Sequence, residues 1–184
     1  METLNPRSRS DAFGSKINRA SSPLLVLLIP WLSILLGSLA PFLPIISPAP
    51  IMPPLGFLLM IAWRLMRPGL LPLWAGLPLG LFDDLFSGQP LGSGVLLFSL
   101  AMIAIELTEL RFPWRGFWQD WSMAALLLSI FLYVSALFSG ADWSLMQLQV
   151  ILPQLLLSIV LFPIIVRMVA LLDRLRLRRV RRVD

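Results

Sequence analysis

The chain contains no cysteine and no histidine, and these two absences remove several classes of chemistry. Thiol catalysis, zinc sites built from cysteine and histidine, haem ligation by histidine and Ser-His-Asp triads all need one of the missing side chains. Carboxylates, hydroxyls, amides and guanidinium groups remain, and the acidic residues show no spacing typical of a metal site. We therefore expect no catalytic residue, no metal site, no cofactor and no enzymatic activity.

Charge is also scarce, since only 14% of the 184 residues are charged, against about 25% in soluble proteins. Hydrophobic residues make up 58% of the chain and the mean hydropathy is +0.84. These values are typical of an integral membrane protein. The pI is about 11.2, but the basic residues flank apolar runs instead of forming an aromatic-interleaved surface. We therefore expect no nucleic-acid partner.

The distribution of arginine and lysine predicts a membrane topology. All fifteen basic residues fall in four regions, at residues 7–19, 64–67, 111–115 and 167–182. The loops expected on the other side, between the members of each pair of spans, carry no basic residue: the first, at residues 41–54, has no charge, the second holds Asp83 and Asp84, and the third holds Asp142. Basic loops remain on the cytoplasmic side of a membrane. The pattern predicts an all-α polytopic protein of the cell inner membrane, with six transmembrane helices in one bundle and both termini cytoplasmic.

The expected organisation is a polar cytoplasmic tail (1–22), a six-span transmembrane domain (23–172) and a basic cytoplasmic tail (173–184). The expected spans occupy residues 23–42, 45 or later to 66, 68–82, 85–105, 120–138 and 143–166. The first apolar run has about 20 residues, longer than the roughly 7–15 of a signal peptide, so we expect a retained helix. The third span measures only about 22 Å as a helix, against a hydrocarbon core of roughly 30 Å. Either Arg67 snorkels and the carboxylates stay among the headgroups, or an aspartate lies inside the bundle.

The third span also carries the pattern Gly76-x-x-x-Gly80, which allows two membrane helices to approach closely. Asp84 follows four residues later and shares the face of the two glycines. Asp83 points about 100° away, so Asp84 is the better candidate for a buried role. The glycine-rich stretch 87–94 is interpreted as a turn, with close packing as the alternative.

Residues 80–92 read Gly-Leu-Phe-Asp-Asp-Leu-Phe-Ser-Gly-Gln-Pro-Leu-Gly, after a proline-bearing second span that ends near Trp63-Arg64. This pattern resembles the rod shape-determining protein MreD family, most strongly over about residues 53–100. Asp83 departs from the family pattern, which has an apolar residue at that position, so Asp83 is expected to be a solvated local variation. The residues that match the pattern are Gly80, Asp84, Ser87, Gly88, Leu91 and Gly92. With Gly76 they are the candidate residues for helix packing or partner binding.

The resemblance implies a non-catalytic scaffold subunit of the cell-elongation machinery that makes peptidoglycan. It implies association with the bitopic protein MreC and, through it or beside it, with MreB filaments, the glycosyltransferase RodA and its penicillin-binding transpeptidase. The family fold is thought to be similar to the six-helix substrate-binding subunit of vitamin transporters. A small-molecule-binding transporter subunit is therefore the alternative function.

Two further polar sets have open interpretations. Glu106 and Glu109 share a helix face, as a paired acid and base would, but a solvated ion-pair cluster with Arg111 and Arg115 explains them better. Three glutamines on the sixth span either line a cavity or hydrogen-bond between helices. These are Gln147, Gln149 and Gln154.

A cluster of arginines near the C-terminus predicts binding to anionic lipids or to a cytoplasmic partner such as a filament. Each positive charge near an anionic leaflet contributes about 1 kcal/mol. The cluster consists of Arg174, Arg176, Arg178, Arg179, Arg181 and Arg182.

Overall fold

The computed structural model describes residues 19–21, 23–42, 52–112, 116–140, 144–176 and 179–181. Within these ranges the protein is all-α, apart from two strands of three residues each. The six helices are α2 (Pro23–Ser38), α3 (Leu55–Met66), α4 (Gly76–Ser87), α5 (Ser93–Arg111), α6 (Phe117–Phe138) and α7 (Leu145–Arg176). Short 3-10 turns follow α2 at Ala40–Phe42 and precede α4 at Leu73–Ala75.

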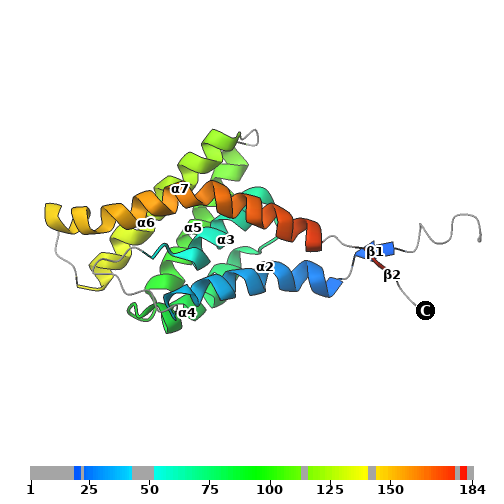
Figure 1. Cartoon of the computed structure of the whole chain (residues 1–184), viewed down its shortest axis with the longest axis horizontal. Coiled ribbons are helices and arrows are strands. Elements are labelled where there is room, and N and C mark those ends of the chain that lie inside the picture. The colour runs from blue at the N-terminus through cyan, green and yellow to red at the C-terminus, as the bar shows by residue number, and fades with distance from the viewer. Residues whose placement is uncertain are drawn as a thin grey trace, which may run out of the picture.

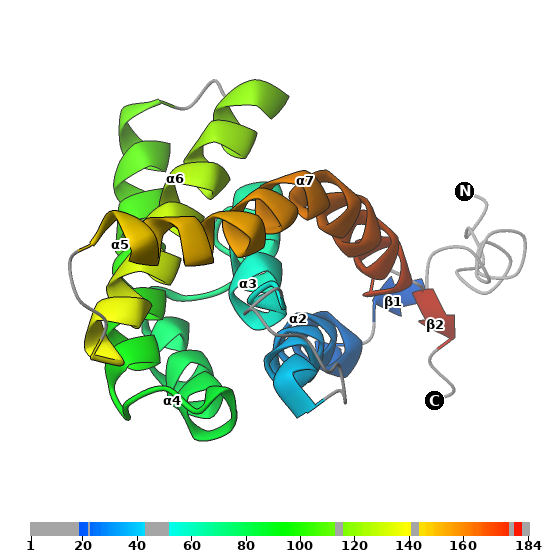
Figure 2. The ribbon, with the colours of Figure 1, turned by 60° about the vertical axis from the view of Figure 1, so that its left-hand side comes forward.

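Helix α3 forms the centre of the molecule, with α2 on one side and α7 on the other (Figures 1 and 2). Its residues 56–65 are all buried, and Trp63 is fully enclosed. The helix is apolar around its whole circumference except for Arg64, as expected for a helix surrounded by others. The aromatic rings of Phe57, Phe98 and Phe131 join α3 to α5 and α6 in the core, with centroid separations of 4.1–6.1 Å.

Three helices are long and apolar enough to cross a membrane, namely α5, α6 and residues Met146–Arg176 of α7. The outward faces of these helices carry many exposed large apolar side chains. A lipid environment explains them, because contact with lipid does not penalise their exposure. The protein is therefore a membrane protein. Helix α7 curves across α3 and α6 in Figure 2 and contains Pro153 and Pro163, the usual cause of bending in a long helix.

The structure moves several of the expected helix boundaries. The expected third span, residues 68–82, is wrong as a helix, because residues 68–72 are not helical and α4 begins only at Gly76. Both aspartates of this region consequently lie within α4 instead of beyond its end. Helix α7 continues past residue 166 to Arg176, so Arg174 and Arg176 are helical.

The two strands bring together segments from opposite ends of the sequence. Strand β1 (Arg19–Ser21) pairs antiparallel with β2 (Arg179–Arg181), with Arg19 opposite Arg181. They lie at one end of the molecule, beyond the N-terminus of α2 and the C-terminus of α7 (Figure 1). This pairing puts the two terminal basic segments beside each other at one end of the helical body.

Candidate functional site

Helices α4 and α5 form a hairpin whose backbones touch through glycine. A β-carbon on Gly80 would lie 2.5 Å from the carbonyl oxygen of Gly94 and 2.7 Å from Cα of Val95. A β-carbon on Gly76 would lie 2.9 Å from Cα of Ser99. The close approach expected from the glycine spacing is therefore present, and it occurs within the chain, between α4 and α5.

Asp84 lies on the same face and its carboxylate is bound to the start of α5. Oδ1 accepts a hydrogen bond from the backbone N–H of Gly94 at 2.6 Å, and the hydroxyl of Ser93 lies 3.2 Å from Oδ1 but closer, at 2.8 Å, to the carbonyl of Pro90. Oδ2 accepts from the backbone N–H of Gly92 at 2.8 Å and of Val95 at 3.3 Å. Only 3% of Asp84 is exposed, so the expectation of a buried role is confirmed.

This arrangement is a helix cap supplied by a neighbouring helix. The residue at the N-cap position of α5 is Gly92, which has no side chain to accept a hydrogen bond from the first turn. Asp84 supplies the missing acceptor, and its negative charge faces the positive end of the α5 dipole. The buried carboxylate is thus satisfied without a basic side chain, and it holds the two helices of the hairpin together.

The turn between α4 and α5 depends on glycine conformations. Gly88 has φ +71° and Gly92 has φ +100°, both in the left-handed region that side chains disfavour. A β-carbon at either position would have no neighbour within 4 Å, so backbone conformation and not space selects glycine there. Leu91, at the tip, is 73% exposed and contributes nothing to the packing of the hairpin.

Asp83 is buried as well, with 7% exposure, so the expectation of a solvated Asp83 is wrong. Rotation by 100° does move Asp83 off the α5 face, but α2 and α3 cover the face it moves to. A β-carbon on Gly56 of α3 would overlap the hydroxyl of Ser38 and would lie 3.1 Å from Oδ1 of Asp83. Asp83 therefore lies at the junction of α2, α3 and α4.

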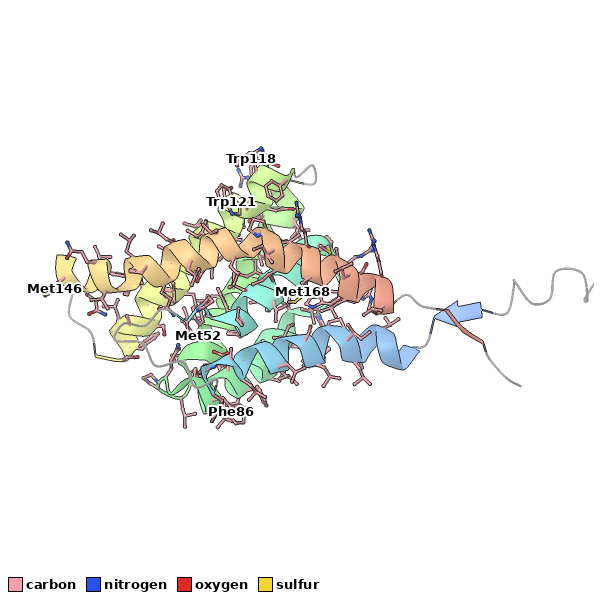
Figure 3. The ribbon with its side chains drawn as sticks, viewed as in Figure 1. Met52, Phe86, Trp118, Trp121, Met146 and Met168 are labelled. Atoms are coloured by element: carbon pink, nitrogen blue, oxygen red, sulfur yellow. The ribbon has the colours of Figure 1, made fainter. Side chains whose placement is uncertain are left out.

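A cavity of about 180 Å³ adjoins this junction. Its polar lining comes from Ser38, Asp83, Ser87, Gln89 and Gln154. Gln154 of α7 also donates a hydrogen bond from Nε2 to the carbonyl of Met52, in the segment before α3, at 2.5 Å, so this glutamine both lines the cavity and joins α7 to a neighbouring segment. Figure 3 shows Met52 between α7 and the α2–α4 side of the molecule.

Sequence analysis missed Ser38, Gly37 and Gly56 as parts of this region. A β-carbon on Gly37 would lie 3.0 Å from the backbone nitrogen of Gly56, so α2 and α3 also approach closely. The available signal was the pair of small residues Gly37-Ser38 in an otherwise bulky apolar run, because small residues mark helix contacts in membranes.

A second polar cluster lies at the opposite end of α3. Arg64, only 2% exposed, forms ion pairs with Glu106 and with Glu109, the latter at 3.2 Å. The principal partner of both glutamates is therefore the buried Arg64. The expectation that they form a solvated cluster with Arg111 and Arg115 is wrong in this respect. Arg115 lies outside the described residues. Helix α5 meets α3 here, and a fully desolvated guanidinium needs a carboxylate beside it.

The C-terminal part of α7 contributes a further ion-pair network. Arg67 donates to Oδ2 of Asp173 at 2.6 and 3.0 Å, and Arg176 lies 3.1 Å from Oδ1 of the same carboxylate. The guanidinium of Arg176 also lies over the ring of Trp63, 5.9 Å from its centroid. Arg176 is buried and internally paired, so the expectation that it contacts lipid or a partner is wrong.

The other predicted tail arginines divide by position. Arg174 is an exposed residue of α7, whereas Arg179 and Arg181 belong to β2. Arg178 and Arg182 lie outside the described residues.

The prolines of α7 create a further contact between helices. Pro163 lacks the N–H that would pair with the carbonyl of Ile159, and Nε1 of Trp121 donates to that carbonyl at 3.1 Å. Trp121 and Trp118 lie near the N-terminal end of α6, with ring centroids 5.6 Å apart (Figure 3). The tryptophan thus satisfies a backbone group that proline leaves without its helical partner.

Among the described residues no group of three acidic side chains has the arrangement of a metal site. The two best-defined polar features are instead the Asp84 cap and the cavity beside Asp83. No protein-family model, curated protein or solved structure matches this chain.

Proposed function

We propose that this protein is a non-catalytic scaffold subunit of the cell-elongation machinery in the cell inner membrane. The observation that carries the proposal is the Asp84 cap: the glycines and the aspartate of the MreD-like pattern form one hydrogen-bonded α4–turn–α5 unit. A structural role explains why that pattern combines glycine spacing with an acidic residue. Every polar contact of the Asp84 carboxylate described above is internal, so it offers no nucleophile or base to a substrate.

The proposed topology has six spans and cytoplasmic termini. Helices α2, α3 and α4 have 16, 12 and 12 residues, or about 24, 18 and 18 Å, less than a hydrocarbon core of roughly 30 Å. In this proposal each short helix crosses the membrane together with its flanking 3-10 and non-helical residues. Helices α5, α6 and α7 pack along one side of the short helices. The ion-pair clusters of Arg64 and Asp173 lie at the cytoplasmic end, and the Asp83 cavity lies towards the opposite end.

The absence of cysteine makes this topology directly testable, because single cysteines need no prior removal of native ones. Ser10→Cys, Ser139→Cys and Val183→Cys would be labelled in intact cells with a membrane-impermeant maleimide. The proposal expects labelling only of Ser139→Cys, with the other two labelled after the membrane is permeabilised. Labelling of Val183→Cys in intact cells would overturn the topology.

The proposed partners are an MreC-like single-span protein and, with it, MreB filaments, RodA and the penicillin-binding transpeptidase. The tip of the hairpin is a suitable contact because Leu91 is a large apolar side chain that the bundle itself does not use. The rigid cap beneath Leu91 would present it in a fixed position. Anionic lipids are the proposed ligands of the tail arginines other than Arg176.

The experiment that tests the function is controlled depletion in the native host with cell width measured by microscopy. An elongation scaffold predicts rounding and swelling before growth stops. In the same cells, Leu91→Asp should reduce co-purification of the single-span partner, whereas the control Leu110→Asp, equally exposed at the other end of α5, should not. Unchanged shape on depletion would refute the proposal.

A second experiment tests the tail. Arg174, Arg178, Arg179, Arg181 and Arg182 would be changed to glutamine, leaving Arg176 to pair with Asp173. We expect less phosphatidylglycerol to be retained on the purified protein, measured by native mass spectrometry. Equal retention would reduce these arginines to a signal for topology.

The cavity beside Asp83 favours the alternative function, a small-molecule-binding subunit of a transporter. This alternative predicts normal cell shape after depletion, growth that is rescued by a supplied nutrient, and an energising partner in place of the wall-synthesis proteins. The depletion experiment therefore separates the two functions.

A further inference from the structure

The polar cavity contains a carboxylate without a counter-charge. Its lining includes Asp83 and no arginine or lysine. The other buried carboxylates described above differ from Asp83, since Asp84 accepts backbone N–H groups and Asp173 pairs with two arginines. Within the described part of the chain, Asp83 has neither kind of partner. Burial of a charge without compensation is costly.

Hydroxyl groups around the carboxylate also have capacity for a ligand. Oγ of Ser87 is buried and has no hydrogen-bond partner among the described residues, whereas the hydroxyl of Ser38 faces the Asp83 carboxylate, to which it can donate while its lone pairs remain available to accept. Ser38 is 2% exposed and lies beside Asp83 against Gly56. Buried hydroxyls normally have a partner, so the Ser87 hydroxyl and the lone pairs of Ser38 beside one carboxylate indicate a ligand that donates hydrogen bonds.

The size and the remaining lining restrict the chemistry of that ligand. The cavity volume of about 180 Å³ is many times the roughly 10–15 Å³ that one water molecule needs, so it exceeds a single ion or water. Pro41, Pro53, Leu55 and Phe131 supply apolar walls. An organic group therefore fits beside the charged end.

We propose that this cavity binds a small organic cation through its ammonium group, with the Asp83 carboxylate as counter-ion and the Ser38 and Ser87 hydroxyls as further acceptors. An ammonium group offers three N–H donors, which matches one carboxylate and two hydroxyls. Its alkyl portion contacts the apolar walls. The ammonium comes either from a free amine or from the headgroup of phosphatidylethanolamine.

The full-length protein would be tested in phosphatidylglycerol nanodiscs at pH 8 by equilibrium dialysis against radiolabelled n-butylammonium, with n-butanol as the uncharged control. We expect saturable binding of n-butylammonium and at least about tenfold weaker binding in Asp83→Asn, because a charge-assisted hydrogen bond is lost. Ser38→Ala should weaken binding severalfold. Ser139→Ala, at an exposed position outside the cavity, should bind as the unaltered protein does.

Circular dichroism and gel filtration establish that each variant is folded, and Ser38→Ala provides a second route if Asp83→Asn is not. Repetition in discs that contain phosphatidylethanolamine identifies the source: weaker n-butylammonium binding there indicates a lipid headgroup, and equal binding indicates a free amine. Absence of binding, equal binding of n-butanol, or full affinity in Asp83→Asn would overturn the proposal. These outcomes are independent of the cell-shape experiment.

Discussion

The exchange Asp84→Asn tests the helix cap most directly. The carboxylate has two acceptor oxygens, one facing the N–H of Gly94 and the other the N–H groups of Gly92 and Val95, whereas an amide has one oxygen and one NH₂ group. Whichever way the amide turns, its NH₂ group faces donors at the start of α5. The variant keeps the size of the side chain, so any change reports on hydrogen bonding and charge.

The magnitude follows from the hydrogen bonds that the amide cannot accept. Loss of an N-cap acceptor costs about 0.5–2 kcal/mol, and a hydrogen bond to a charged group contributes about 1.5–3 kcal/mol. One or two backbone N–H groups, depending on which way the amide turns, would be left facing its NH₂ group in a site that is only 3% exposed. We therefore expect Asp84→Asn to lower the free energy of unfolding by about 2–4 kcal/mol.

The assay is reversible unfolding in mixed micelles with increasing mole fraction of dodecyl sulfate, followed by tryptophan fluorescence. Asp83→Asn is the matched control because it makes the same chemical change one residue away in the same helix. It removes a buried charge that no described backbone N–H binds, so stability should change by less than about 1 kcal/mol. A stable Asp84→Asn variant, or equal losses in both variants, would refute the assignment of the cap.

Three other expectations follow from the packing. Gly80→Ala should destabilise the hairpin by about 1–3 kcal/mol, because the added methyl group overpacks against α5. Gly88→Ala meets no neighbour, so it should cost only the roughly 1–2 kcal/mol of a left-handed backbone. A larger loss for Gly88→Ala than for Gly80→Ala in the same unfolding assay would contradict this order. Arg64→Ala should lower the free energy of unfolding by about 2–3 kcal/mol. This is less than the roughly 3–5 kcal/mol for breaking a fully buried ion pair, because Glu106 is partly exposed. A change below about 1 kcal/mol would show that the ion pairs are not formed. Trp121→Phe should lower the free energy of unfolding by about 1 kcal/mol. The loss should be smaller in a Pro163→Ala background, where the restored N–H can pair with the carbonyl of Ile159. Equal losses in the two backgrounds of this double-mutant cycle would exclude the proline explanation.

Sequence alone determined the class of the protein and the local geometry of its most informative segment. Low charge, high hydropathy and proline-rich breaks are properties of composition, so they predict membrane helices without knowledge of the fold. Helical periodicity alone places Gly76, Gly80 and Asp84 on one face, because the spacing of four residues is nearly one turn. The close packing of that face and the burial of Asp84 both agree with this periodicity.

The tertiary structure decided which faces are covered and which charges meet. Periodicity gives the angle between Asp83 and Asp84, but it contains no information on whether another helix lies at either angle, and α2 and α3 bury the face assigned to solvent. The pairing of Arg64 with Glu106 likewise joins residues from α3 and α5, whose relative positions no local pattern specifies. The late start of α4 has a local cause instead, since Gly69 has φ +79° and Pro72 has an extended backbone directly before the 3-10 turn at Leu73–Ala75.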